Sequence, residues 1–350
     1  NNRVAIDLRV EAGRRAYVRR INIIGNARTR DEVIRREFRQ YESSWYDAEK
    51  IKLSRDRVDR LGYFTELSVS TADVPGAPDQ VDLNVEVKEK PTGNISIGAG
   101  YSSAEKLALT FGLTQDNVFG SGNRLDLQVN TGKYNRTLVV SATDPYFTVN
   151  GVSRTVDVYY KSQKPYQDQG GNYTLVTMGV GLKFGLPVTE LDTVYLGMNA
   201  ERTRIKPGTN IPAAYLAYAE RFGYSSAAFP FTLGWSRDSR DSALAPTSGR
   251  YQRLIGELGL LGDARYAKAD YQYQQYVPLS KSYTLAFNGE AGWGKGLGGR
   301  PFPVFKNFYS GGLGSVRGYD QNTLGPRDVT GAFTGGTRKF TLNTEFITPF

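Results

Sequence analysis

The sequence predicts a membrane all-β protein, in which an antiparallel transmembrane β-barrel follows a small α+β domain of order β-α-α-β-β. Three observations carry this prediction. Apolar and polar residues alternate in stretches of roughly ten from residue 94 to the end. The connections between these stretches differ in length at the two ends of the strands, and a mixed pattern of helices and strands occupies residues 13–91.

The alternation is clearest in residues 173–185, where a period of two places successive side chains on opposite faces of a sheet. The same pattern recurs in residues 106–114 and 265–276. The polar face holds small or hydrophilic residues, as a water-filled interior requires. In the first stretch the apolar face consists of Val176, Met178, Val180, Leu182 and Phe184.

The connections between strands distinguish a soluble β-sandwich from a membrane barrel, since the alternation fits both. About twelve strands are expected after residue 93. Short turns follow every second strand, whereas longer segments follow several of the others, including residues 205–226 and 296–339. Short turns at one rim and long loops at the other are typical of outer-membrane barrels, which favours the barrel.

Composition limits the class of protein further. The chain has 350 residues, a mean hydropathy of −0.44 and no apolar run long enough for a membrane helix. A barrel strand needs only ~9–11 residues, about half of them apolar. Histidine and cysteine are absent, so the usual catalytic triads and zinc sites cannot form, and no metal or cofactor is expected. The net charge of +9 is spread along the chain, which argues against nucleic acid as a partner.

Residues 13–91 are expected to form one compact α+β domain. Its first strand begins at Tyr17 and stops at the turn pair Gly25-Asn26. Thr29 is expected to cap the first helix, with Glu32 completing a capping box. The apolar spacing of this helix predicts a buried face that comprises Val33, Ile34, Phe38 and Tyr41.

A second helix and two strands complete this domain. The helix is expected to start near Asp47, which can cap it, and to stop at Gly62. The strands are expected at residues 64–70 and 81–87, because both alternate in hydrophobicity. Val74-Pro75-Gly76 opens the turn between them.

The expected domain boundaries follow from these elements. Residues 90–93 form a short, stiff hinge, and the barrel occupies residues 92–350 with its long loop at residues 296–339. Residues 1–12 alternate like the last strand of a preceding domain.

The order strand, helix, helix, strand, strand resembles the POTRA domain (polypeptide-transport-associated). A POTRA domain joined to a barrel resembles the superfamily that contains BamA, TamA, the mitochondrial sorting proteins and the two-partner secretion transporters. Several stretches resemble the BamA-type members in particular, and together they cover nearly the whole chain. They are GGLGSVRGY (311–319), NTLGP (322–326), Gly25-Asn26, DEVIRRE (31–37), RLGYF (60–64), DQV (79–81), QDNVFGSG (115–122) and TDPYFTVNG (143–151).

The resemblance implies an assembly factor in the outer membrane of a Gram-negative bacterium, with its POTRA region in the periplasm. Such a protein folds and inserts β-barrel proteins by templating their strands at a lateral seam, without covalent chemistry. The implied partners are unfolded outer-membrane β-barrel proteins, lipoprotein subunits of the assembly complex (the Bam complex), periplasmic chaperones, and outer-membrane lipid and lipopolysaccharide. The resemblance also implies a barrel of about sixteen strands, so about four are expected to be missing. Phe350 could mimic the C-terminal aromatic residue of a complete barrel, but Pro349 beside it cannot donate to a strand ladder, so a truncated barrel is expected.

The first candidate site is a tether between the long loop and the barrel wall. Arg317 lies in a glycine-rich segment, where a solvated arginine is the ordinary interpretation. The glycines permit backbone paths that suit a loop folding back into a confined lumen. The alternation of the last strand points Glu345 into the lumen, so we expect a charge-assisted pair, as the resemblance also implies. The site comprises Arg317, Gly318, Tyr319 and Glu345.

The second candidate site is the first barrel strand, residues 94–102, which has few large side chains and two glycines. For each residue alone, an ordinary strand position is the simpler interpretation. The resemblance implies that this strand forms a movable seam with the final strand, where substrate strands pair by β-augmentation. The templating residues would be Asn94, Ile95, Ser96, Ile97, Gly98, Ala99, Gly100 and Tyr101.

The third candidate site is the solvent face of the first helix. Arg35, Arg36, Arg39 and Glu42 are expected there, either as an ordinary solvated face or as a docking surface. The resemblance implies that a companion lipoprotein meets this POTRA domain at the position of Glu42, so Glu42 and Arg39 are the predicted docking residues. Exposed strand edges of the domain could also receive unfolded polypeptide.

Three other functions remain open at the level of sequence. One is a polypeptide-secreting transporter or a TamA-like autotransporter assembly factor of the same superfamily. The others are a passive pore, which the POTRA domain and the glycine-rich loop argue against, and an enzyme, for which no carboxylate pair stands out. Two glycine motifs at residues 289–295 and 294–299 fit nucleotide binding only in part, because a hydroxyl residue and a helix are missing where they are needed.

Overall fold

The computed structural model divides into two compact units. The first contains the α+β domain up to Gly93 together with Gln115–Asn123, and the second contains the remaining strands. No helix in the described part of the chain is long and apolar enough to cross a membrane. The strand expected at residues 1–12 lies outside the described residues. The structure describes residues 15–102, 106–164, 171–242, 245–280, 282–312 and 314–348.

The first unit is a three-stranded sheet with two helices, and its elements follow one another in the predicted order. The central strand of the sheet pairs in parallel with one neighbour and antiparallel with the other, in the order β1-β3-β2. The elements are β1 (Tyr17–Ile24), α1 (Asp31–Arg35), α2 (Ala48–Arg60), β2 (Phe64–Val74) and β3 (Ala77–Glu89).

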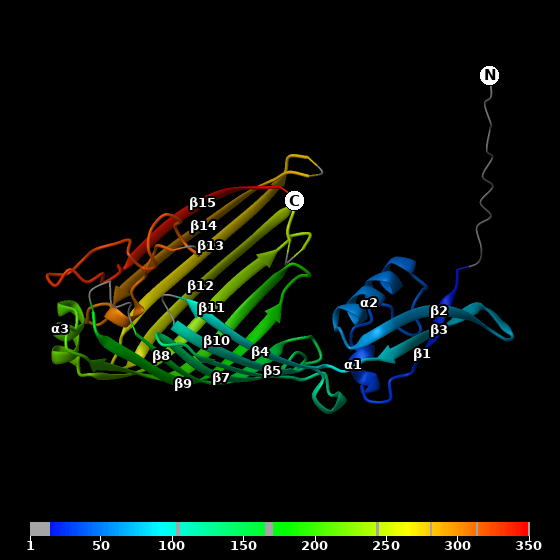
Figure 1. Ribbon diagram of the computed structural model, residues 1–350. Coiled ribbons are helices and arrows are strands. Elements are labelled where there is room, and N and C mark those ends of the chain that lie inside the picture. The colour runs from blue at the N-terminus through cyan, green and yellow to red at the C-terminus, as the bar shows by residue number, and fades with distance from the viewer. Residues whose placement is uncertain are drawn as a thin grey trace, which may run out of the picture. The chain divides into compact units, whose positions relative to one another are not determined.

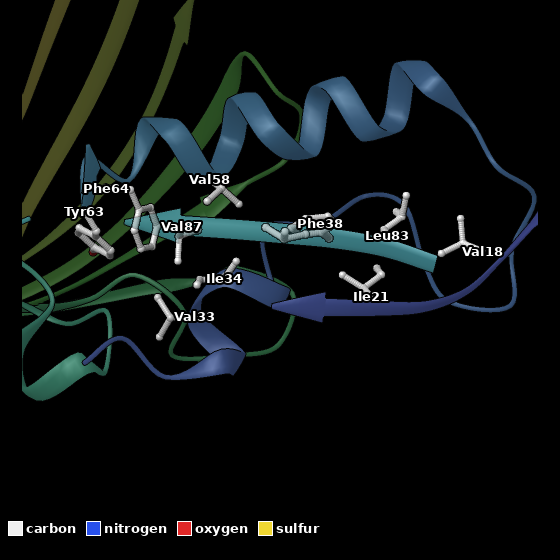
Figure 2. Packing of buried hydrophobic residues seen from close by; sticks show 11 residues of the cluster. Val18, Ile21, Val33, Ile34, Phe38, Val58, Tyr63, Phe64, Leu83 and Val87 are labelled. Atoms are coloured by element: carbon white, nitrogen blue, oxygen red, sulfur yellow. The ribbon is translucent and has the colours of Figure 1, made fainter. Parts of the chain in front are cut away.

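The hydrophobic core of this unit lies between the sheet and its helices, as Figure 2 shows. Burying one such aliphatic or aromatic side chain stabilises a fold by about 1.5–3 kcal/mol, so this core supports a domain with its own folding energy. Its buried residues are Val18, Ile21, Val33, Ile34, Phe38, Val58, Tyr63, Phe64, Leu83, Val85 and Val87.

The first helix is shorter than predicted, and its predicted capping box is wrong. α1 ends at Arg35, and no side chain caps its N-terminus. The Thr29 hydroxyl instead accepts a hydrogen bond from Asn117 Nδ2 at 2.8 Å, so it is occupied by a residue remote in sequence. Tyr41 is 64% exposed rather than buried, because the chain has left the helix before reaching it.

The second helix and the hairpin follow the sequence closely. Asp47 caps α2, because its carboxylate accepts the backbone N–H groups of Glu49 and Lys50 at 3.0 and 3.1 Å. Gly62 has a φ of 72°, the left-handed conformation that ends helices. β2 and β3 extend further than predicted and are joined by a tight turn at residues 75–76.

The segment Gln115–Asn123 belongs to the first unit by its contacts. The backbone N–H of Arg30 donates to the Gly120 carbonyl at 3.0 Å. Gly120 and Gly122 have φ values of 73° and 74°, and a Cβ atom on Gly120 would collide with the Arg28 backbone carbonyl. Both positions therefore favour glycine by conformation, and Gly120 is also required by close packing.

The second unit is one curved antiparallel sheet of twelve strands, in which each strand neighbours the next along the chain (Figure 1). Helix α3 (Ala213–Phe222) interrupts the connection between two of them. The strands are β4 (Gly93–Ser102), β5 (Lys106–Gln115), β6 (Arg124–Thr131), β7 (Asn135–Asp144), β8 (Ser153–Gln163), β9 (Tyr173–Pro187), β10 (Asp192–Pro207), β11 (Ser225–Asp238), β12 (Gly249–Gly262), β13 (Tyr266–Pro278), β14 (Thr284–Gly296) and β15 (Arg338–Ile347).

The register preserves the predicted division of faces across neighbouring strands. Met178 lies opposite Tyr160 on β8, and Val180 lies opposite Val158. These side chains are all substantially exposed, as expected of an apolar surface that meets lipid. Val176 on the same face is an exception and is only 5% exposed. The opposite face collects charged groups, among them Asp157, Lys183, Glu201, Glu257, Lys268, Glu290 and Glu345.

The sheet is open in the described residues, with β4 and β15 as its two edges. Connections are sorted by length less completely than predicted. Residues 132–134 and 263–265 form short connections at the end that also carries the long segments 208–224 and 297–337. Two antiparallel neighbours need only a tight turn between them. A connection is therefore long only where its residues pack against other parts of the protein.

Candidate functional site

The long loop at residues 297–337 is a folded element. Phe308 and Gly336 exchange two backbone hydrogen bonds of 2.8 and 2.9 Å, which close the base of the loop. Isolated bridges also join Ser310 to Leu324 and Arg327 to Phe333. These contacts hold the segment that carries Arg317 on a defined backbone path.

The structure brings Arg317 and Glu345 together. Arg317 Nη2 lies 2.5 Å from Glu345 Oε1, and Glu345 projects from the charged face of β15 opposite Ala286. Asn343 lies two residues along the same face and donates to the Ser315 carbonyl at 2.8 Å. The ion pair is open to solvent, with side-chain exposures of 67% and 43%, so it is worth about 0–1 kcal/mol.

The other two residues of the predicted tether contribute backbone geometry. Gly318 has a φ of 86°, which only glycine adopts readily. The Tyr319 carbonyl accepts the Gly312 N–H at 3.0 Å, while its side chain is 56% exposed. A cavity of about 430 Å³ adjoins the site and is lined by Tyr276, Asn288, Ser315, Arg317, Asn343 and Glu345, among others. These groups bind and position one another, and they include no activated nucleophile.

A second ionic contact between loop and wall was not predicted from the sequence. Lys306 Nζ lies 2.8 Å from Glu201 Oε1 and 2.9 Å from Glu257 Oε1. Its side chain is 18% exposed, so it is far better shielded than Arg317. In the sequence, only the position of one lysine within the aromatic stretch 302–309 pointed to this contact. The two acidic partners lie far away in the sequence and could not be inferred from it.

β4 is an edge strand in the described residues, and only its β5 side is paired. Ile95, Ile97 and Tyr101 are 65%, 81% and 76% exposed, and they share the apolar face. On the other face, a Cβ atom at Gly98 would press against the Thr110 hydroxyl. The free edge of β4 thus offers backbone N–H and C=O groups flanked by few large side chains on one face.

The predicted docking residues do not lie on the helix face expected for them. Glu42 and Arg39 follow the end of α1, and both interact within the domain. Glu42 Oε1 accepts the Ile21 backbone N–H at 2.8 Å and pairs with Arg35 Nη1 at 3.2 Å. Arg39 Nη1 donates to the Phe38 and Arg36 carbonyls at 3.5 and 3.3 Å. Arg36 is half-buried, which also corrects its predicted solvent position.

The outer edge of β1 is closed over much of its length, contrary to the expectation of exposed edges. Arg35 Nη2 donates to the Ile21 carbonyl at 3.1 Å, so two side chains satisfy both backbone groups of Ile21. Val18 exchanges backbone hydrogen bonds of 2.7 and 3.0 Å with Ser43 and Ser44. Among the described residues, no strand pairs with the other edge of this sheet, at β2.

These features define a class of protein: a small α+β domain followed by a β-sheet wall that has one apolar and one charged face, with a loop held on the charged face. Comparison with known families agrees. The Omp85 superfamily domain matches residues 117–350, and the POTRA family, described as surface antigen variable number repeat, matches residues 16–90. The chain belongs to the Omp85 superfamily, and its similarity within that family is to BamA-type members. The wall is an outer-membrane structure and the POTRA domain is periplasmic.

Individual relatives support this assignment. The chain is 38% identical to the outer membrane protein assembly factor BamA of Neisseria meningitidis, over 98% of this chain and 45% of that protein. It is 31% identical to BamA of Nitratidesulfovibrio vulgaris, over 96% of this chain and 42% of the relative. The chain thus spans about half the length of these curated relatives.

Solved structures show the same fold. A crystal structure of BamA from Haemophilus ducreyi lacking POTRA domains 1–3 superposes with a TM-score of 0.80 at 29% identity, covering 97% of this chain and 69% of that one. CdiB from Acinetobacter baumannii superposes with a TM-score of 0.63 at 13% identity, covering 96% of this chain and 61% of that one. The second likeness is one of fold alone.

Proposed function

We propose that this chain is the POTRA-and-wall part of an assembly factor that folds and inserts β-barrel proteins into the outer membrane. The observation that supports this best is a POTRA domain joined to a β-sheet wall, in a chain 38% identical to an outer membrane protein assembly factor BamA. In this proposal the backbone of β4 is the edge at which substrate strands pair. An unpaired strand edge inside a bilayer is costly unless another strand pairs with it. An incoming substrate strand removes that cost by forming backbone hydrogen bonds.

In this mechanism the templating groups are the backbone N–H and C=O groups of residues 94–101. Main-chain pairing makes few demands on substrate sequence, which suits a protein that handles many barrels. Energy comes from the substrate, because each added strand satisfies its backbone and buries its apolar face in lipid. The protein makes and breaks no covalent bond, so we infer that it is not an enzyme.

The long loop acts as a tether in this proposal. Arg317 holds the loop to Glu345 on β15, with Gly318 and Tyr319 shaping the backbone around the arginine. This contact couples the conformation of the loop to the position of β15.

The proposed partners include unfolded outer-membrane barrels, lipoprotein subunits of the assembly complex, periplasmic chaperones, and outer-membrane lipid and lipopolysaccharide. We place lipoprotein docking at Glu42 and Arg39. Because the Glu42 carboxylate already pairs with Arg35, a cationic group on the lipoprotein must compete with that arginine.

Disulfide trapping tests the proposal, and the chain contains no cysteine of its own. Ser96→Cys should cross-link to a cysteine in the terminal strand of a substrate barrel arrested during assembly. Leu254→Cys, on the apolar face of the interior strand β12, is the control and should not cross-link. Equal cross-linking at the two positions would reject strand templating, as would normal porin levels in cells depleted of this protein.

A further inference from the structure

Lys306 is a shielded cation at the base of the long loop. It ends a short 3-10 turn at Val304–Lys306 and contacts acids from two non-adjacent strands of the wall. Glu201 comes from β10 and Glu257 from β12, so the ammonium group spans the intervening strand β11. One loop residue thereby connects three parts of the molecule that are far apart in sequence.

Both acids are held in place by tyrosines as well. Tyr159 donates a hydrogen bond to Glu201 Oε2 at 3.0 Å, and the Tyr266 hydroxyl donates to Glu257 Oε1. Lys306 also lies over the Tyr266 ring, 5.2 Å from its centroid. A shielded ion pair is stabilising only when its remaining polar atoms are partnered, and these tyrosines supply such partners.

Two small apolar clusters surround the same turn. Phe302 packs with Tyr266 and Ala264, while Phe305 packs against the cluster that includes Tyr218 of α3. The Tyr215 hydroxyl donates to the Val304 carbonyl at 3.3 Å. Figure 1 shows α3 and the loop at the same end of the sheet. The turn is therefore fixed by packing and by charge, whereas the tip of the loop depends on exposed contacts.

Shielding from solvent decides which of the two ionic contacts holds the loop more strongly on the wall. Water and salt screen the Arg317–Glu345 pair, whereas the Lys306 contacts have little solvent to screen them. Loss of Lys306 leaves two carboxylates on the wall without this cation. Another nearby cation, Lys268, already pairs with Asp270 at 3.6 Å, so it is a poor replacement.

We propose that Lys306 is the main anchor of the loop and the positioning residue that brings Arg317 to Glu345. Fixing the chain at residue 306 shortens the free segment that must find the wall, which raises the local concentration of Arg317 at Glu345. The inference deepens the proposed function, since it specifies what controls the tether. Whether Lys306 anchors the loop can be measured without assaying assembly activity.

The test measures how often the loop lies on the wall in the purified, detergent-solubilised chain. Ser315→Cys and Asn343→Cys replace two residues whose backbone carbonyl and side chain are already in contact, so disulfide formation reports the seated loop. In this background Lys306→Met should slow disulfide formation at least about tenfold, because removing one partner of a shielded ion pair costs more than the free energy that corresponds to a tenfold change. Lys306→Arg retains the cation and should form the disulfide at nearly the original rate.

A rescue variant separates charge from packing. Adding Glu201→Gln and Glu257→Gln to Lys306→Met removes the two unpaired carboxylates but does not replace the anchor, so it should restore only part of the rate. An unchanged rate in Lys306→Met, or a fully restored rate in the rescue variant, would overturn the proposal. If Lys306→Met fails to fold, recovery of folding in the rescue variant supports the charge argument, and its absence rejects it. Normal disulfide rates in a chain that cannot assemble substrates would instead count against the proposed function.

Discussion

At the scale of single residues, the same ionic chemistry has different value in different surroundings. Arg317 and Glu345 form a short pair that water reaches freely, while Lys306 is shielded between two acids. A short distance alone therefore says little about how firmly a loop is held. Exposure decides how much of the attraction survives screening.

Replacing Arg317 with alanine should loosen the loop without unfolding the wall. The exposed pair is worth at most about 1 kcal/mol, so thermal stability should change little. Limited proteolysis within residues 310–325 should become faster, and Arg317→Lys, which keeps the charge, should stay close to the original chain. Unchanged cleavage of the alanine variant would exclude Arg317 as a tether.

Glu89 in the POTRA domain gives a pH-dependent prediction. Its carboxylate accepts the backbone N–H groups of Arg28 and Thr29 at 2.9 and 2.6 Å. Burial raises its pKa, but these hydrogen bonds outweigh burial and leave the pKa below the ordinary value of 4.5. The stabilisation is therefore present above that value and is lost as pH falls through the lowered pKa.

Chemical denaturation at neutral and acidic pH can measure this loss. Glu89→Gln should lower stability at neutral pH and reduce the further loss on acidification. Glu66→Gln, which removes a well-exposed carboxylate in the same sheet, is the control. Identical acid sensitivity of the original chain and Glu89→Gln would contradict the assignment.

At the scale of elements, side chains protect the edge of β1 where no strand pairs with it. Glu42 and Arg35 satisfy the N–H and C=O groups of Ile21, and Val18 pairs with the segment that follows Glu42. A free edge invites association with other polypeptides. Glu42 therefore has a folding role in addition to its proposed role in docking.

Substituting Glu42 with alanine should expose this edge. A hydrogen bond to a charged group contributes about 1.5–3 kcal/mol, so the Ile21 amide should exchange with solvent at least about tenfold faster. Hydrogen exchange resolved by residue would detect the change, and Glu32→Ala, which removes an exposed carboxylate of α1, should not alter it. Full protection of Ile21 in the Glu42 variant would exclude this folding role.

The turn at residues 120–122 shows how strongly two glycines constrain an element. Gly120→Ala should destabilise the first unit by about 1–3 kcal/mol, because left-handed strain adds to a collision with the Arg28 backbone carbonyl. Gly76→Ala is the matched control, since its φ of 82° is similar but nothing lies within 4 Å of its Cβ atom. Equal losses of Tm in the two variants would exclude the steric contribution.

At the scale of the whole molecule, the wall depends on having one face for lipid and one for water. Val180→Arg places a charge on the apolar face and should cost about 2–4 kcal/mol if that position lies near the bilayer midplane. Ser141→Arg lies on the charged face, with Asp126 and Asp157 as its cross-strand neighbours, and should be tolerated. Refolding yield into lipid vesicles measures the difference, and equal yields would reject the assignment of the faces.

The sequence alone determined the features that depend on local spacing. The period of two assigned Met178 and Val180 to one face, and Asp47 marked the start of α2, because strand alternation and helix capping are both decided within a few residues. The alternation of the last strand and the resemblance to a known family together also predicted the pairing of Arg317 with Glu345.

Only the tertiary structure decided which distant residues meet. The Thr29 hydroxyl accepts a hydrogen bond from Asn117 instead of capping α1. Glu42 accepts the Ile21 backbone N–H at the edge of β1, and Lys306 pairs with acids on two strands. Each contact depends on the path of chain segments far apart in sequence. Local patterns specify how a residue is oriented within its element, whereas packing between elements specifies its partner.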